Sequence, residues 1–570
     1  MSNNLDNELR TRAAAFDVPP GDVDVVMTRA GHRTRNRRAL TTVSTIAAVV
    51  ALIAVVVSTG SDHHVVPVHV AGEPAHVADL GISWKRVNPG TTLAFSPIAK
   101  GAGPVYALST APGQVDANAP QNRVVWKSDD GSEWQSVSTL SNDLYIADLS
   151  PTSDRIYAVG TGPATAAVGG QKSSRLVSGW SDDGGKTWQE ADLPVDMNAV
   201  ATKSSSSGLG IAQIASGAKG TVAVATPTAQ LDVNKVLPNG ATAPYGWALT
   251  ETGVDVLGAP PAKDPCPAGT VSDKGGDTSN PAAPPGPVYP TYCMPGDGSK
   301  PAMERTAGQQ PVEVSPQQAR GVTASYTWAQ LGVDGDLLKA IKHQPIGFYA
   351  PPGSTHFERI DLPTPDGTGD ATAVVAGKDG FDVVLSASYG VAPTKTQQQP
   401  PSQLTIVHSA DGRTWDGAPS VEHGVSWTSA SGLLNGQPAI VAEGDGGPVL
   451  LRSDGAGNWT PTSLGALIDA PAGTDRMVTV AGIGPFGVVA VIAPVDKEAG
   501  SRAQPDFRVL TSRDGITWQS DRLSDVAGMS ANTASLVYVT ANQAVLKVSP
   551  QPTPGSKKPG PDVTLVATAK

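Results

Sequence analysis

A short motif recurs along the chain and constrains its fold more than any other feature of the sequence. The octapeptide SDDGGKTW at 181–188 returns as SDDGSEW at 128–134, as SADGRTW at 409–415 and as SRDGITW at 512–518, and a weaker copy, SDGAGNW, occupies 453–459. Self-similarity at spacings of tens of residues is typical of repeat folds, in which one supersecondary unit is used again and again. We therefore expect a repeat protein.

Each copy of the motif lies between two short strand-like runs, such as LVSGW before and WQEADL after the copy at 181–188. This context predicts the loop of a β-hairpin. The adjacent carboxylates of Asp182 and Asp183 would also suit a metal site, an acid/base pair or a sugar contact. A turn nevertheless explains every residue type, because Asp accepts hydrogen bonds from nearby backbone N–H groups, Gly adopts a left-handed backbone at little cost and Trp packs against the hairpin. We interpret the motif as scaffold. The residues expected to build these loops are Ser128, Asp130, Gly131, Trp134, Ser181, Asp183, Gly185, Thr187, Trp188, Ser409, Asp411, Gly412, Thr414, Trp415, Ser512, Asp514, Gly515, Thr517 and Trp518.

The copy at 181–188 fits the S-x-D-x-G-x-T-W pattern of the Asp-box, also called the bacterial neuraminidase repeat. The copies at 409–415 and 512–518 fit a variant that is one residue shorter. On these motifs the chain resembles the sialidase-like Asp-box β-propellers over about residues 80–570. The resemblance implies a single all-β propeller in which each box joins the third strand of a blade to its outermost strand, remote from the substrate pocket.

The strand-like runs around the boxes predict seven blades within residues 81–570. The run ISWKRV at 82–87 carries Trp84 where each box carries its Trp, and the chain ends one strand short of a complete last blade. We therefore expect 82–87 to pair with the last strand and close the ring, which removes open sheet edges. If YGWALTETGVDV at 245–256 is a worn hairpin of a further blade, the count becomes eight.

Seven blades leave about 230–345 as an insertion between the second and third strands of the third blade. This stretch holds a predicted helix from Asp334 to His343 and both cysteines of the chain. Two cysteines are too few for a disulfide framework or a four-thiolate zinc site. We expect Cys266 and Cys293 to form one disulfide, as suits an oxidising exterior, with a reactive or metal-binding pair as the alternative.

The N-terminal region predicts a membrane anchor. Residues 39–61 contain no charged side chain, and as a helix they would span about 34 Å, enough for the hydrocarbon core of a bilayer. The Arg-rich stretch RAGHRTRNRR precedes them, so the positive-inside rule places the short segment 1–38 in the cytoplasm and the rest of the chain outside. A cleaved signal peptide is the alternative, although VVVSTGS offers no small-x-small cleavage site.

Residues 62–80 follow the predicted span and contain four of the nine histidines. Neutral imidazole is a common ligand of zinc or copper, but the spacings are irregular, and Pro67 and Pro74 keep the segment extended. We interpret it as a solvated linker. The chain carries a net charge of −11 and no basic stripe with interleaved aromatic residues, so we expect no nucleic-acid partner.

The two kinds of loop differ in length. The box loops are short and uniform, whereas the connections between second and third strands are long and irregular, as in STAPGQVDANAPQNR at 109–123. In an up-and-down blade the long loops emerge opposite the boxes. Concentrated elaboration on one rim of a rigid ring favours binding there, with tolerated drift in exposed loops as the alternative. The family resemblance implies a substrate site on the same rim.

The catalytic set of a sialidase is not recognisable in the sequence. That family clamps a substrate carboxylate with several Arg residues, uses a Tyr/Glu nucleophile pair and an Asp acid, and shows a Phe/Tyr-Arg-Ile-Pro signature before its first box. Here the segment 82–127 offers only Arg86 and Arg123. No HExxH, G-x-S-x-G or phosphate-loop motif occurs either. We assign no catalytic, cofactor-binding or metal-binding residue.

The sequence therefore favours a membrane-anchored extracytoplasmic propeller that binds a protein or a cell-envelope glycan without catalysis. One alternative is an Asp-box glycoside hydrolase with unrecognised carboxylates, which predicts two facing carboxylates about 5–10 Å apart near the propeller axis. A binding module predicts exposed aromatic or apolar patches on the rim instead. A third possibility is a transmembrane sensor that acts through residues 1–38.

Overall fold

The computed structural model describes residues 75–87, 96–98, 104–110, 123–129, 134–140, 144–162, 175–259, 266–272, 287–288, 291–295, 312–364, 368–387, 403–416, 420–423, 425–444, 447–468, 475–495, 507–550 and 562–569. The chain divides into two units at residue 70, and all the described residues belong to the second unit, residues 71–570. The predicted cytoplasmic segment, the predicted span at 39–61 and most of the predicted linker lie outside them. Within the described ranges, no helix has the length and apolar character needed to cross a membrane.

The described residues form an all-β structure in which seven sheets each contain a four-stranded antiparallel meander. Numbered in chain order, sheet 1 consists of β3 (Ser96–Ile98), β4 (Val105–Thr110), β5 (Arg123–Ser128) and β6 (Gln135–Thr139). Sheet 2 consists of β7 (Tyr145–Pro151), β8 (Ile156–Gly162), β9 (Arg175–Ser181) and β10 (Gln189–Asp192). Sheet 3 consists of β11 (Ser204–Gly217), β12 (Gly220–Leu231), β19 (Ile346–Ala350) and β20 (Glu358–Ile360).

The remaining four sheets repeat this plan. Sheet 4 consists of β21 (Thr368–Ala376), β22 (Phe381–Ala387), β23 (Gln403–Ser409) and β24 (Ser420–His423). Sheet 5 consists of β25 (Val425–Leu434), β26 (Gln437–Gly444), β27 (Gly447–Ser453) and β28 (Trp459–Ser463). Sheet 6 consists of β29 (Asp475–Gly484), β30 (Gly487–Val495), β31 (Arg508–Ser512) and β32 (Thr517–Arg522). Sheet 7 consists of β33 (Ala531–Val539), β34 (Gln543–Pro550), β35 (Val563–Ala569) and β2 (Ile82–Val87).

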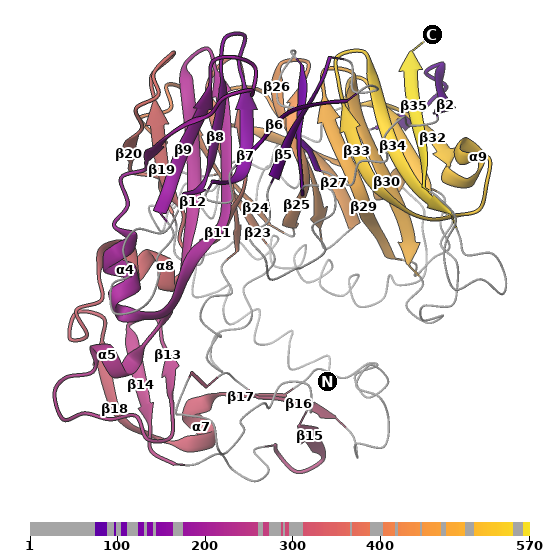
Figure 1. Ribbon diagram of the computed structural model, residues 1–570. Helices are drawn as coiled ribbons and strands as arrows, with labels where there is room; N and C mark the ends of the chain where they lie inside the picture. The colour runs from indigo at the N-terminus through magenta and orange to yellow at the C-terminus, as the bar shows by residue number, and fades with distance from the viewer. Residues whose placement is uncertain are drawn as a thin grey trace, which may run out of the picture. The chain divides into compact units, whose positions relative to one another are not determined.

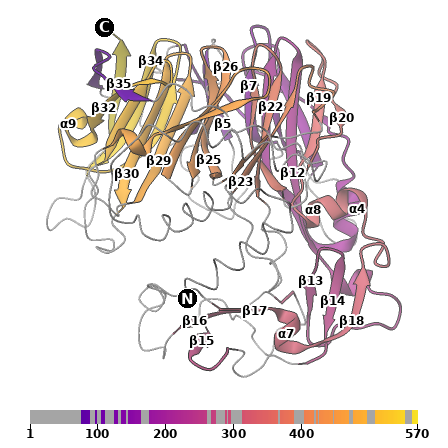
Figure 2. The same cartoon turned by 180° about the vertical axis from the view of Figure 1, so that it is seen from behind.

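The first strands of the seven sheets form a closed ring. The strands β3, β7, β11, β21, β25, β29 and β33 each contact the next, and β33 contacts β3 again. Figures 1 and 2 show the sheets from opposite sides, with neighbouring sheets standing side by side. A closed ring of radially arranged antiparallel sheets is a β-propeller. The first strand of each sheet is therefore its innermost strand, and the fourth is its outermost.

The core lies between neighbouring sheets, and β30 shows why the sequence folds this way. Its residues Val488, Val489, Ala490, Val491 and Ile492 are all fully buried. Val489 and Val491 pack in a cluster with side chains of sheet 7, whereas Val488, Ala490 and Ile492 pack in a cluster with side chains of sheet 5. Successive residues of a strand face opposite sides of its sheet. A continuous apolar run is therefore what a strand buried on both faces requires.

The N-terminal strand closes the ring, as predicted from ISWKRV. Strand β2 pairs antiparallel with β35, and Trp84 lies opposite Ala567. The side chain of Gln519 in β32 fixes the entry of this strand, because its Oε1 accepts from the backbone N–H groups of Leu80 and Ile82 and its Nε2 donates to the carbonyl of Ile82 at 2.9 Å. This pairing covers the edge of β35 in the last sheet with a strand from the N-terminal part of the chain.

The described end of the predicted linker 62–80 is solvent-exposed and pairs with the edge of sheet 6. Residues His76–Val77 form strand β1, which pairs in parallel with β32, with His76 opposite Thr517. Ala78 then donates its backbone N–H to the carbonyl of Trp518 at 2.8 Å. The backbone pairing with β32 thus fixes the position of His76. The described residues contain no group of His, Cys, Asp and Glu side chains suited to a metal ion. The other three histidines of this segment lie outside the described ranges.

Residues 232–345 lie between the paired strands β12 and β19 and form the expected insertion. Strands β13 (Trp247–Leu249), β14 (Gly253–Leu257) and β18 (Val322–Thr327) make one three-stranded sheet, and β15 (Thr270–Ser272), β16 (Thr291–Pro295) and β17 (Val312–Val314) make another. The hairpin at 245–256 pairs with β18 and not with two further strands, so it is not an eighth blade. The helices nearby are α4 (Met197–Lys203), α5 (Val233–Val236), α7 (Pro316–Arg320) and α8 (Gly335–Ile341), and α9 (Leu523–Ala527) follows β32.

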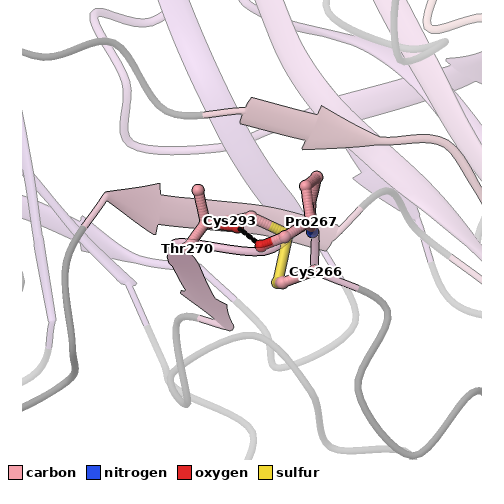
Figure 3. Close-up of a disulfide and its surroundings, with 4 residues drawn as sticks. All are labelled: Cys266, Pro267, Thr270 and Cys293. Carbon is pink, nitrogen blue, oxygen red and sulfur yellow. Dashed lines mark hydrogen bonds between the residues drawn. A yellow bond between two sulfur atoms is a disulfide. The ribbon is translucent and has the colours of Figure 1, made fainter.

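Two sequence predictions about the insertion are confirmed. Helix α8 begins after the N-cap Asp334 and buries Leu337, Ala340 and Ile341, close to the predicted bounds. A disulfide joins Cys266 to Cys293, and the Cα atoms are 5.5 Å apart. Figure 3 shows this bond beside the hydrogen bond that the Thr270 hydroxyl donates to the carbonyl of Pro267.

Candidate binding surface

The octapeptide at 181–188 is a self-contained hydrogen-bonded loop between β9 and β10. The Asp183 Oδ1 atom accepts from the backbone N–H groups of Lys186 and Thr187, and its Oδ2 atom accepts from the Thr187 hydroxyl at 2.7 Å. The Ser181 hydroxyl donates to Asp183 at 2.8 Å and accepts from the backbone N–H of Gly185. The Asp183 carboxylate thus stabilises the turn by accepting four hydrogen bonds from its own loop.

The other boxes repeat this geometry in their sheets. Asp411 Oδ1 accepts from the backbone N–H of Thr414 at 2.7 Å, and Asp514 Oδ1 accepts from that of Thr517 at 2.8 Å. Both loops place a glycine with positive φ directly after the Asp, 78° at Gly412 and 76° at Gly515, a backbone conformation that disfavours side chains. In the weaker copy Asp454 bonds the backbone N–H and the side-chain amide of Asn458.

The box at 128–134 is described only at its ends. Ser128 is buried at the end of β5, and the ring of Trp134 meets that of Tyr538 edge-on at 5.8 Å. Because Tyr538 belongs to β33, this contact joins sheet 1 to sheet 7. Asp130 and Gly131 lie outside the described residues.

The tryptophans and carboxylates of the boxes serve the fold. Trp518 and Trp459 are 0% and 1% exposed. The pKa of Asp183 is lowered to about 2, chiefly by the hydrogen bond from the Thr187 backbone. The pKa of Asp411 is lowered mainly by the backbone N–H of Thr414. Burial raises the pKa of Asp514, but its backbone and hydroxyl donors outweigh burial and leave it lowered. An anion held this firmly by its own loop suits neither acid nor base catalysis.

The opposite end of the ring is built differently. Because each sheet is a meander, its innermost strand begins at the end away from the box loops, and the connections between second and third strands emerge there too. We call this the loop end, and the other the box end. Five innermost strands share an unpaired bulge residue, which lies near the loop end in β7 and at mid-strand in the other four: Ala147, Thr372, Ser429, Thr479 and Ser535. Strands β21, β25 and β33 have a further irregularity closer to the loop end.

We call the residue two places before each bulge residue the pre-bulge position. It holds Tyr145 in sheet 2, Asp370 in sheet 4, Trp427 in sheet 5 and Met477 in sheet 6. Bulges often re-aim side chains next to functional sites. Tyr145 is 47% exposed, Trp427 60% and Met477 47%. On the described parts of the innermost strands these are the large apolar side chains that face solvent. Three sheets therefore expose such a side chain at the same structural position.

Tyr145 is held by a cation from the neighbouring sheet. The guanidinium carbon of Arg123, the first residue of β5, lies 4.1 Å from the centre of the Tyr145 ring. Arg123 Nη1 also donates to the carbonyl of Ile146 at 3.0 Å. The guanidinium stacks on the ring, and Tyr145 remains 47% exposed beside it.

Two half-buried carboxylates lie at the same end. Burial raises the pKa of Asp370, although the nearby imidazole of His343 and the hydroxyl of Thr226 work against this rise. Burial also raises the pKa of Glu443 in β26, whose Oε1 accepts from the backbone N–H of Val478 in sheet 6. The pKa shifts at the loop end are therefore opposite in sign to those of the box carboxylates.

The pre-bulge residues were not singled out from the sequence. These residues share a position only relative to the bulge. The bulge residues themselves have nothing in common in the sequence beyond a small to medium size. The one available signal was Trp427, a large aromatic residue near the start of a strand that otherwise reads SWTSASG. Most of the long loops that the sequence marks as the binding rim, including 111–122, 163–174 and 388–402, lie outside the described residues.

Comparisons with known proteins give only distant similarities. The sequence matches no protein-family model and no curated protein. Among solved structures the chain is similar to YCF48 bound to D1 peptide, at 10% identity and a TM-score of 0.34, over 87% of this chain and 98% of that one. It is similar to Trypanosoma rangeli sialidase, at 12% identity and a TM-score of 0.30, over 81% of this chain and 59% of that one. It is also similar to the Bombyx mori GH32 β-fructofuranosidase BmSUC1, at 8% identity and a TM-score of 0.31, over 83% and 91% of the two chains. At these TM-scores the propeller assignment rests on this chain's own strand order.

Proposed function

We propose that this chain is a membrane-anchored, extracytoplasmic, sialidase-like propeller of seven blades that binds a protein or a cell-envelope glycan through its loop end, without catalysis. The observation that carries this proposal is the exposure of Tyr145, Trp427 and Met477 at the same structural position of three sheets. Aromatic residues and Met are enriched at interfaces. Repetition around one end of a ring favours a common surface over three unrelated exposures.

Photo-crosslinking tests this binding role. A photoreactive amino acid is placed at position 427 of the full-length protein in its own cells, and a matched one at position 413, where the exposed Arg413 lies in a box loop. We expect light-dependent adducts with envelope components from position 427 and none from position 413. Equal yields at the two positions, or none at either, would contradict a binding surface at the loop end.

The proposed location rests on other features. The uncharged run 39–61 with its Arg-rich flank suits an anchor with the N-terminus inside, and the Cys266–Cys293 disulfide suits an oxidising compartment. Protease added to sealed, right-side-out membrane vesicles should digest the propeller and spare the N-terminal segment. Protection of the propeller until the vesicles are lysed would refute the proposed orientation.

A glycoside hydrolase is the second candidate, and Asp370 is the observation that favours it. A carboxyl group whose pKa is raised by burial is suited to act as a general acid, and Asp370 occupies a pre-bulge position near the axis. A panel of chromogenic glycosides tests this candidate. Hydrolysis that is lost in Asp370→Asn, while Tyr145→Ala retains it, would replace the non-catalytic proposal.

A further inference from the structure

A hydrogen-bonded imidazole and carboxylate close the apolar core between sheets 4 and 5 at the box end. Asp382 and His408 are register partners in strands β22 and β23, and the Nδ1 atom of His408 lies 3.0 Å from the Oδ1 atom of Asp382. Leu404 and Ile406 come earlier on the same face of β23 and pack in a cluster with side chains of sheet 5. The His408–Asp382 pair therefore faces sheet 5.

The surroundings of this pair favour the protonated imidazole. The side chains of His408 and Asp382 are 13% and 1% exposed, and a buried carboxylate is costly unless it is paired. The hydrogen bond to Asp382 raises the pKa of His408 against the effect of burial. Burial raises the pKa of Asp382, and the hydrogen bond and charge of His408 oppose that rise. The pair thus keeps its shared proton to a higher pH than an isolated imidazole would.

The weak box loop of sheet 5, residues 453–459, lies against His408. A Cβ atom added to Gly457 would stand 3.3 Å from the Cβ atom and 3.4 Å from the Cγ atom of His408. Two further carboxylates raise the pKa of His408, that of Asp454 in this loop and that of Asp416 just after the box of sheet 4. The protonated ring therefore attracts the loop that packs on it.

Other charged side chains near this contact have partners of their own. Asp379, in the turn between β21 and β22, lies beside the weak box loop, and its Oδ2 atom is 3.9 Å from the Nζ atom of Lys378. Arg413, in the box of sheet 4, is turned towards sheet 3, where it pairs with Glu358 at 2.8 Å. The charge of a histidine changes most readily near neutral pH, so His408 is the group of this contact that responds there.

We infer that His408 is a pH-sensitive switch that holds the weak box loop of sheet 5 against sheet 4 when it is protonated and loosens this loop when it is neutral. In the neutral state the buried carboxylate of Asp382 loses its cation, and the charge of Asp454 acts on it unfavourably. The contribution of His408 is present below its ordinary pKa of 6.5 and is lost as the pH rises through its raised folded pKa. This inference does not rest on the proposed function, which concerns the loop end.

Hydrogen–deuterium exchange of the full-length protein in detergent tests this switch. Exchange is followed by mass spectrometry in peptides that cover 453–459 and, as an internal reference, the box at 512–518, with labelling times scaled to the intrinsic exchange rate at each pH. Between about pH 6 and about pH 9 we expect the protection of 453–459 to fall about five- to tenfold. Gly515 of the reference box packs against Arg452 and leucine side chains, and the protection of this box should stay within about twofold.

Three variants separate the effect of the proton from that of packing. His408→Gln keeps a hydrogen-bond donor beside Asp382 but takes up no proton, so the protection of 453–459 should be low and equal at both pH values. Asp382→Asn removes the buried charge, so the protection should be high and equal. His356→Gln removes an exposed histidine from the loop before β20 and should behave as the wild type. Thermal melting at the lower pH confirms that each variant is folded.

Three results would overturn the inference. The first is wild-type protection of 453–459 that is the same at both pH values, and the second is a pH dependence that persists in His408→Gln. The third is an equal fall in 453–459 and 512–518, because that fall would come from the propeller as a whole. Crosslinking from position 427 tests the proposed function independently of these results.

Discussion

The two ends of the propeller use the same residue types for opposite purposes. At the box end, carboxylates such as Asp183 and Asp514 accept several hydrogen bonds from their own loops, and tryptophans such as Trp518 are buried. At the loop end, the carboxylates of Asp370 and Glu443 have raised pKa values, and Trp427 faces solvent. At the box end the repeated residues stabilise the fold. At the loop end the equivalent positions hold different exposed side chains, and the proposed binding surface rests on these.

Replacing one tryptophan at each end gives the largest difference that we expect. Trp518→Ala removes a fully buried ring from between sheets 5 and 6 and should lower the free energy of unfolding by about 3–5 kcal/mol. Trp427→Ala should change it by no more than about 0.5 kcal/mol, as is usual for exposed positions. Urea denaturation followed by circular dichroism measures both. Similar losses from the two variants would break the comparison.

Replacing a box carboxylate should have a smaller effect. Asp514→Ala leaves the backbone N–H groups of Ile516 and Thr517 without their acceptor and should cost about 1–2 kcal/mol, as for the loss of a helix N-cap. Asp514→Asn keeps one acceptor oxygen and should lose less than half as much. The same denaturation experiment tests this order. A larger loss for the Asn variant would show that charge, and not hydrogen bonding, stabilises the loop.

The smallest expected effect is a difference in the sign of pH dependence. The pKa of Asp183 falls from 3.8 to about 2 on folding, so its stabilisation is present above pH 3.8 and is lost as the pH falls towards 2. The pKa of Asp370 is raised on folding, so its contribution is present below pH 3.8 and is lost as the pH rises through the folded pKa.

Melting temperatures between about pH 2 and pH 7 measure both effects. Asp183→Asn should flatten the acid limb of the curve. Asp370→Asn should melt slightly above the wild type at neutral pH and match it near pH 3, because Asn avoids the cost of a buried charge. If the melting temperatures of the two variants changed with pH in the same way, the carboxylates of the two ends would not differ in their electrostatic effect on stability.

Much of the fold was predictable because its signals are local. The Asp, Gly and Trp of each box predict a hairpin from no more than eight residues. Trp84 predicts the closing strand because it occupies the place of a box Trp. Phe357 directly precedes β20, as each box Trp precedes or begins the outermost strand of its sheet, and its ring is buried too. A single pair of cysteines in a region expected outside the membrane left little choice of disulfide, and that bond is formed.

The predictions that failed, or were not made, depend on distant partners. The hairpin at 245–256 has the alternation of a blade, but its sheet is decided by β18, more than sixty residues further along the chain. The pre-bulge position was not predicted because a bulge depends on how two strands pair. The sequence of one strand alone does not show where it occurs. The exposure of Trp427 follows from its place on that irregular strand. Sequence patterning therefore described the box end well and the loop end poorly.

The pairing of β2 with β35 has a mechanical consequence for an anchored protein. In the arrangement proposed above, any tension between the membrane and the propeller arrives through residues just before β2. It is carried first by the short β1–β32 pairing and by the hydrogen bonds of Gln519 to Leu80 and Ile82. Only after these yield does the pull reach β2, whose removal from β35 would open the ring. In that arrangement the segment that links the propeller to its anchor is also the segment that closes the ring. The hydrogen bonds of Gln519 hold this segment in place.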